Sequence, residues 1–160
     1  MKPFASTFDL FAHAAHTPLG AAELEQYPQL ASPLDRTLGT HYIYASAEKV
    51  EAEITVTDAL TQPWGVAHGG VYAALAESVG SMLGILVGGG VTPVVGVNNN
   101  TNFLRPVQVG GKIHAVATVI SAGKTTQLLR VTMTSDHRLV AESTLRTIVM
   151  APRTADLRER

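Results

Sequence analysis

The chain has 160 residues, of which 46% are hydrophobic and 16% charged, with a formal net charge of −1 and no cysteine. This length and composition suit one domain with a substantial core. The scattered lysines and arginines argue against nucleic acid or a membrane as partner and favour a small molecule or another protein chain. The lack of cysteine excludes thiol nucleophiles, disulfides and thiolate-bound metals. It also fits a reducing compartment, and because the N-terminus lacks a continuous apolar signal, we expect a cytoplasmic protein.

Residues 1–38 are expected to form an irregular, partly helical lead. Phe8, Phe11, Ala12 and Ala15 recur at helical spacing, and prolines then interrupt the pattern. Nothing in this segment indicates chemistry.

From residue 39 onwards the pattern predicts strands around one helix. The helix is expected over residues 69–87, and the glycines at 88–90 favour a left-handed ending. An α+β domain over residues 39–152 follows, in which an antiparallel sheet of about six strands curls around the helix, with a tail at 153–160. The predicted strands are Thr40–Ser46, Lys49–Thr57, Pro93–Phe103, Lys112–Ser121, Thr125–Ser135 and Arg138–Met150.

Glu77 is the residue of this helix that points to chemistry. Apart from Tyr72 it is the only ionisable side chain from Val71 to Val91, and an ionised carboxylate without a partner is costly to bury. The run is long enough to consider as a membrane span, but Glu77 and the closing glycines favour a helix buried in protein. Packing alone would explain the small residues here but not the carboxylate, unless an arginine partner or an outward position removes the cost. Glu77 is therefore the candidate catalytic group.

The start of the same helix offers a second reactive feature. The free N–H groups of Gly69 and Gly70 lie at the positive end of the helix dipole, where they could hold an oxygen that gains negative charge. Glu77 lies eight residues beyond Gly69, or ~12 Å along the axis, too far for one small group to touch both. Two chains related by a two-fold axis could supply them together, which predicts a dimer. Ser81, one turn after Glu77, could orient the carboxylate, a water or the substrate, or could serve packing alone.

Two sequence blocks resemble a known family. The first is Asp-Ala-Leu-Thr-Gln-Pro-Trp-Gly-Val-Ala-His-Gly-Gly-Val-Tyr-Ala-Ala-Leu-Ala-Glu at residues 58–77, and the second is Asn-Thr-Asn-Phe-Leu-Arg-Pro-Val at residues 100–107. They resemble the hot-dog-fold thioesterases, specifically the bacterial aryl-CoA type exemplified by 4-hydroxybenzoyl-CoA thioesterase. The resemblance covers roughly residues 58–152 and includes the nine-residue interval from His68 to Glu77. It implies the hot-dog fold, in which an antiparallel sheet wraps a long central helix.

The resemblance implies hydrolysis of an acyl-CoA thioester without a metal or organic cofactor, coenzyme A being part of the substrate. Glu77 would attack the thioester carbonyl as nucleophile or activate a water, and both roles stay open. The Gly69 N–H of the other chain would hold the oxyanion, Gln62 would donate a hydrogen bond near the acyl group, and His68 would position the thioester or the departing thiolate. Ser81 stands where close relatives have Thr.

The same resemblance assigns the coenzyme A end of the substrate. Phosphates and the pantetheine arm require cations and hydroxyls. At Lys124 the relatives have Ser, and each cation could instead be an ordinary surface charge, Arg153 more so than the other two. The matching positions are Arg105, Lys124, Thr125 and Arg153, with Gly70 as a backbone contact.

Several functions stay open at this stage. One is an aryl-CoA thioesterase for a hydroxybenzoyl, phenylacetyl or hydroxynaphthoyl group, and another is a medium-chain or broad-specificity fatty acyl-CoA thioesterase. A non-catalytic acyl-CoA-binding protein is disfavoured by Glu77, and a hot-dog dehydratase by its different acid and histidine spacing. The family also implies a dimer of dimers, and the charge distribution favours neither nucleic acid nor a membrane as partner.

Overall fold

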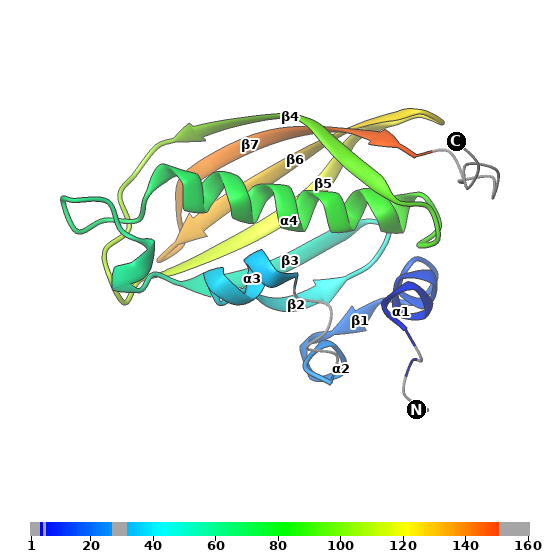
Figure 1. Cartoon of the computed structure of the whole chain (residues 1–160), viewed down its shortest axis with the longest axis horizontal. Coiled ribbons are helices and arrows are strands. Elements are labelled where there is room, and N and C mark those ends of the chain that lie inside the picture. The colour runs from blue at the N-terminus through cyan, green and yellow to red at the C-terminus, as the bar shows by residue number, and fades with distance from the viewer. Residues whose placement is uncertain (1–3, 5, 27–31, 151–160) are drawn as a thin grey trace, which may run out of the picture.

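One long helix lies along one face of a single antiparallel sheet (Figure 1). The computed structural model describes residues 4, 6–26 and 32–150. Within them the helical segments are α1 (Thr7–Ala14), α2 (Ala21–Leu24), α3 (Pro33–Leu38), the 3-10 turn η2 (Asp58–Leu60) and α4 (Gly69–Val87). The strands are β1 (Leu19–Gly20), β2 (His41–Ala45), β3 (Lys49–Thr55), β4 (Val94–Phe103), β5 (Lys112–Ala122), β6 (Thr126–Ser135) and β7 (Arg138–Val149).

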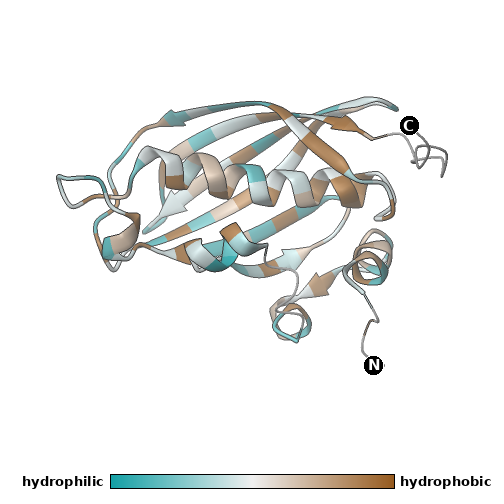
Figure 2. Cartoon of the chain, viewed as in Figure 1, coloured by the Kyte–Doolittle hydropathy of each residue, from teal (hydrophilic) through white to brown (hydrophobic). Residues whose placement is uncertain are grey.

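The sheet has seven strands in the order β1-β2-β3-β5-β6-β7-β4, so β4 forms one edge. The six predicted strands are confirmed to within two residues at each end, and the short β1, which pairs with β2, is the seventh. Alternation explains the agreement, because Val50, Ala52 and Ile54 of β3 are buried beneath α4 while the intervening residues are polar. Figure 2 shows this alternation along the strands. The predicted hot-dog architecture is confirmed.

The central helix α4 has the predicted bounds, Gly69–Val87. Its N-cap is His68, whose Nδ1 accepts the Gly70 N–H at 2.9 Å. The helix ends at the predicted glycines, where Gly89 and Gly90 have φ values of 86° and 79°, a left-handed conformation that favours glycine. By length and composition alone α4 could span a membrane, but it packs on the sheet with ten residues buried.

Close contact between α4 and the sheet depends on two glycines. A Cβ at Gly80 would lie 2.7 Å from the buried Leu145 side chain, and one at Gly84 would lie 2.6 Å from Oε1 of Gln127. Gln127 itself donates from Nε2 to the Gly84 carbonyl at 3.0 Å and accepts from the Thr147 hydroxyl at 2.8 Å. Buried polar groups are thus satisfied where helix and sheet meet, and this contact fixes which face of α4 turns outward.

The predicted apolar face of the lead is only partly correct. In α1 the fully buried residues are Leu10 and Ala14, whereas the predicted Phe8 is 59% exposed. A helix of two turns has too few residues for periodicity to define its inner face, which is set by contact with α4. α3 also contacts α4, so the lead covers part of the helix face turned away from the sheet.

Gly84→Ala is expected to lower the free energy of unfolding. Alanine favours the helical conformation over glycine by about 1 kcal/mol. The added Cβ would however displace Gln127 from a well-packed core, and such over-packing costs about 1–3 kcal/mol. Urea unfolding should therefore show a loss, whereas Ser78→Ala, on the face turned away from the sheet, should change stability by less than about 0.5 kcal/mol. Equal stability of Gly84→Ala and wild type would contradict the close contact.

Candidate active site

Glu77 lies on the outer face of α4 and lines a cavity of about 620 Å³ between that face, the lead and β2. The predicted burial of Glu77 is wrong for the single chain, because its side chain is exposed. The sheet covers the opposite face of the helix, and α1 and α3 leave this stretch open. The cavity is lined by Phe11, Ser32, Leu34, Asp35, Tyr42, Ala73, Ala74, Glu77, Ser78, Ser81, Met82 and Ile85.

The Glu77 carboxylate lies beside the edge strand of the sheet. A Cβ at Gly96 of β4 would lie 2.9 Å from Oε1 of Glu77, so the strand backbone passes directly next to it. Within the described part of the chain no hydrogen-bond donor or cation contacts the carboxylate. Ser81 lines the same cavity one turn later, where its hydroxyl can face a bound group, and Ser78 adds another hydroxyl. Glu77 is therefore open to a reactant.

A chain of hydrogen bonds anchors the turn that carries Glu77. Asn99 of β4 donates from Nδ2 to the Ala73 carbonyl at 2.9 Å. Its Oδ1 accepts from the Thr101 hydroxyl at 2.8 Å, and Thr101 lies 2.7 Å from the buried hydroxyl of Ser143. This turn is held to the edge strand by polar as well as apolar contacts.

The beginning of α4 is held by backbone pairing of the loop before it. The Ala67 N–H donates to the Val107 carbonyl at 2.8 Å and the His68 N–H to the Leu60 carbonyl at 2.9 Å. Among the described residues, no acceptor pairs with the Gly69 N–H, which is therefore free to bind a ligand oxygen. Phe103 leaves no free space for a side chain at this position, since a Cβ on Gly69 would lie 3.0 Å from its ring.

Gly69 opens into a smaller cavity of about 310 Å³. Gln62 lines it, with its Oε1 accepting the Trp64 N–H at 3.4 Å and its amide nitrogen left to donate. His68 is exposed next to it, and the bond from Gly70 to Nδ1 assigns the proton of the neutral ring to Nε2. The cavity is lined by Gln62, Val66, Ala67, Gly69, Tyr72, Phe103, Leu104, Arg105 and Pro106.

The structure thus places Glu77 and Gly69 in two separate cavities that share no residue. Gln62 and Arg105 accompany Gly69, and Ser81 accompanies Glu77. One chain does not bring the predicted site residues together.

The residues assigned to coenzyme A are also divided. Arg105 is exposed at the Gly69 end, where its Nη1 donates to the Leu139 carbonyl. Lys124 and Thr125 are exposed in the turn between β5 and β6, and this turn adjoins Val149 and the region after α4, at the other end of the helix (Figure 1). Arg153 lies outside the described residues. No single protomer can offer Arg105 and Lys124 to one nucleotide.

Sequence reasoning missed the contribution of the lead and of β2 to this region. Asp35 of α3 and Tyr42 of β2 both line the Glu77 cavity, although no motif marks them. Burial, and then the negative charge of Asp35 and the hydrogen bond between the two side chains, raise the pKa of the Tyr42 phenol, so this hydroxyl stays protonated. The weak available signal was the Ser-Pro-Leu-Asp pattern at residues 32–35, a helix-capping sequence that says nothing about a ligand.

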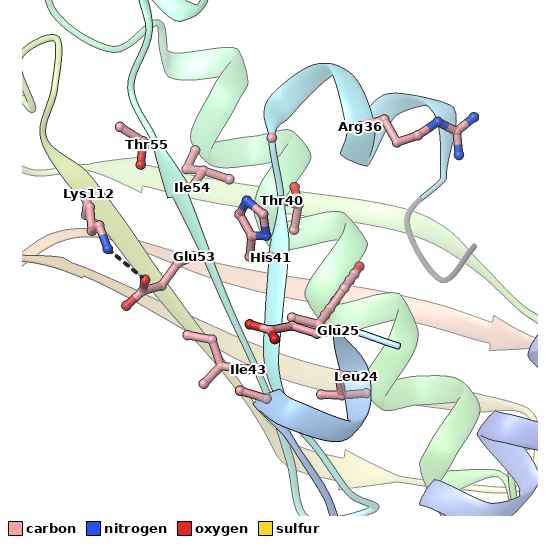
Figure 3. A pocket seen from close by; sticks show the side chains of 13 residues that line it. Leu24, Glu25, Arg36, Thr40, His41, Ile43, Glu53, Ile54, Thr55 and Lys112 are labelled. Atoms are coloured by element: carbon pink, nitrogen blue, oxygen red, sulfur yellow. Dashed lines mark ion pairs between the residues drawn. The ribbon is translucent and has the colours of Figure 1, made fainter. Parts of the chain in front are cut away.

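A further cavity, of about 770 Å³, lies between α2 and the β2 end of the sheet (Figure 3). Its wall carries both signs of charge, and Lys112 Nζ lies 3.5 Å from Oε2 of Glu53. None of the predicted site residues lines it. The charged lining residues are Glu25, Arg36, Glu53 and Lys112, and His41 lines the cavity as well.

Comparison with known proteins identifies the family. A sequence model described as the thioesterase superfamily matches residues 65–142. A Mycobacterium tuberculosis protein, named provisionally as an esterase, is 37% identical over 118 residues, which cover 71% of this chain and 84% of the relative. The chain belongs to the thioesterase superfamily.

Other relatives agree with this membership. The crystal structure of a thioesterase from Haemophilus influenzae superimposes on this chain with a TM-score of 0.74 and 34% sequence identity. The match covers 83% of this chain and 94% of the Haemophilus chain. A 1,4-dihydroxy-2-naphthoyl-CoA thioesterase of Arabidopsis thaliana is 31% identical over 115 residues, covering 68% of this chain and 73% of the relative. The matched segment contains the whole of β4 and of α4, the helix that carries both Gly69 and Glu77.

Removing the Gly69 N–H from this thioesterase-superfamily chain should lower turnover without unfolding the helix. Proline suits the first helical position, and the preceding His68 has ψ of 139°, which proline accepts. If this N–H binds the oxyanion, as the sequence predicts, its loss should lower kcat by about 10²–10³. Gly69→Ala is the matched control, because it adds the same Cβ against Phe103 but keeps the N–H. Equal kcat for the two variants would show that the N–H has no catalytic role.

Proposed function

We propose that this thioester hydrolase cleaves an aromatic acyl-CoA to the free acid and coenzyme A, at a site shared by two protomers. Glu77 of one protomer attacks the thioester carbonyl or activates a water, while the Gly69 N–H of the partner subunit binds the oxyanion. Gln62 donates a hydrogen bond near the acyl group, and Nε2 of His68 faces the departing thiolate. The main support for a shared site is that Glu77 and the unpaired Gly69 N–H open into different cavities of one chain.

The edge strand β4 supports a specific pairing of the two protomers. An unpaired edge is a template for another strand, and β4 has a neighbour, β7, on one side only. Gly96 at one end lies beside Glu77, and Phe103 at the other end lies against Gly69. A two-fold axis between residues 99 and 100 would set Gly96 opposite Phe103 of the partner subunit, since antiparallel partners count in opposite directions. The same axis would bring Glu77 towards Gly69 of the partner subunit.

The composition of the Glu77 cavity supports an aromatic acyl group. Its volume lies in the range of small-molecule pockets, and its wall combines apolar side chains with a few polar groups. Arg105 of one protomer and Lys124 of another are the proposed contacts for the coenzyme A phosphates, with Thr125, Gly70 and the C-terminal Arg153 in supporting roles. We also propose that the protein assembles as a dimer of dimers and is located in the cytoplasm.

A medium-chain or broad-specificity fatty acyl-CoA thioesterase is the second candidate. The apolar part of the cavity wall, which includes Phe11, Leu34, Met82 and Ile85, would also accept an alkyl chain. Such an enzyme should show activity that changes gradually with chain length, whereas an aryl enzyme should select one ring type.

The reaction is tested by thiol release from hydroxybenzoyl, phenylacetyl, dihydroxynaphthoyl, octanoyl and palmitoyl esters of coenzyme A. Wild type should release thiol mainly from one aromatic ester. Glu77→Gln keeps the side-chain shape but removes the base and nucleophile, so kcat should fall by about 10²–10⁴ while the affinity for the ester stays. Unchanged turnover in Glu77→Gln would contradict the mechanism, and a broad profile would favour the fatty acyl alternative.

The shared site is tested by mixing two inactive chains. In a mixed dimer of Glu77→Ala and Gly69→Pro, one of the two sites combines an intact Glu77 with an intact Gly69 N–H. Random mixing at equal amounts makes half of the dimers mixed, so activity should recover to about a quarter of the wild-type value. Mixed dimers confirmed by mass spectrometry but without activity would rule out a site built from both chains.

A further inference from the structure

One end of the Glu77 cavity is lined by apolar residues from two elements. Ile85 of α4 lies eight residues after Glu77, which is ~12 Å further along the helix axis. Phe11 of α1 lines the same cavity. Both residues are partly exposed in the single chain, so each has apolar surface that the core does not cover. We call Phe11 and Ile85 the end wall.

The position of Phe11 is fixed by the packing of α1 on the end of α4. Leu10 and Ala14 form the buried face of α1. A Cβ at Gly90, in the glycine turn after α4, would overlap the carbonyl group of Phe11, so the two backbones are in direct contact. Figure 1 shows α1 beside this end of α4. Phe11 therefore lies at the Ile85 end of the cavity, on a helix that is packed in place.

The proposed reaction decides which part of the substrate fills this cavity. With the thioester carbon beside Glu77, the coenzyme A arm leaves towards the smaller cavity, which contains Gly69 of the partner subunit. The acyl group is left with the space between α4 and the lead, which passes Ser81 and reaches the end wall. Acyl atoms within about 12 Å of Glu77 along the helix can therefore be buried. Atoms beyond the end wall must turn into water.

We propose that Phe11 and Ile85 limit the length of the acyl group that the enzyme can bury, because they close the cavity about 12 Å from Glu77. A benzoyl or naphthoyl group ends before the end wall, as does a benzoyl group with a short alkyl tail, whereas a long alkyl tail extends past it. The two residues determine specificity and take no part in bond breaking. This inference rests on the proposed function, because it sets the size limit of the acyl group at the same site.

The test is the gain in affinity for each added methylene group. A methylene that moves from water into the cavity should strengthen binding by up to about fourfold, and one that stays in water should add nothing. Calorimetry on Glu77→Gln, which prevents turnover, gives Kd for benzoyl-, 4-butylbenzoyl- and 4-octylbenzoyl-CoA. Binding should strengthen by about 10-fold or more from benzoyl to butylbenzoyl. It should not strengthen further from butylbenzoyl to octylbenzoyl.

Phe11→Ala and Ile85→Ala, each added to Glu77→Gln, shorten the end wall from two different elements. In either folded variant the octyl tail should bind at least about 10-fold more tightly than the butyl tail, since the extra methylenes gain a place in the cavity. Phe8→Ala is the matched control, because Phe8 is on the same helix but is 59% exposed and lies outside the cavity lining. It should keep the limit. Thermal unfolding shows that each variant is folded.

Three results would overturn the end wall. One is binding that keeps strengthening through the octyl tail while Phe11 and Ile85 are both intact. Another is a limit that stays unchanged in both end-wall variants, and the third is a limit that Phe8→Ala removes equally.

Thiol release by chains with Glu77 intact separates this inference from the reaction itself. A limit in Kd that is lifted by Phe11→Ala or Ile85→Ala would support the end wall even if no ester released thiol, an outcome that would overturn the proposed hydrolysis alone. Glu77-dependent thiol release, together with binding that strengthens through the octyl tail in the intact cavity, would overturn the end wall alone.

Discussion

The close contact of α4 with the sheet at Gly80 and Gly84 is the constraint on which the rest of the structure depends. Glycine at both positions lets the helix lie close to β6 and β7, where there is no room for a Cβ. The hydrogen bond from Gln127 holds the helix there. Once this face is turned inward, the face with Glu77 and Ser81 is turned towards the lead and the edge strand. A larger residue at either glycine would alter the position of the carboxylate as well as the stability of the core.

The straight helix explains why the proposed site needs two chains. A helix holds its first N–H and a residue two turns later at a fixed separation, and no side-chain rotation closes it. In this chain each of the two groups opens into its own cavity, and the unpaired edge of β4 runs alongside both. Arg105 and Lys124 likewise lie near opposite ends of α4. A long substrate that extends across an interface between protomers could contact one of them from each chain.

The N-terminal lead contributes more than a cover for the core. It supplies β1 to the sheet and places α1 and α3 against the outer face of α4, which turns an exposed helix face into one wall of a cavity. Superfamily members share the central helix and sheet, and function depends on the groups that surround the reacting bond. Asp35 shows that a segment outside the main motif lines the same cavity as Glu77.

The sequence by itself determined the elements and the spacing of the motif residues. Strand alternation, the glycine-terminated helix and the interval from Gly69 to Glu77 are local properties, so six strands and α4 were predicted to within two residues. The tertiary structure decided the exposure of Glu77, the buried face of α1 and the presence of Asp35 in the cavity. These depend on which distant segments pack together, and a two-turn helix or a single aspartate has no periodic pattern that records such contacts.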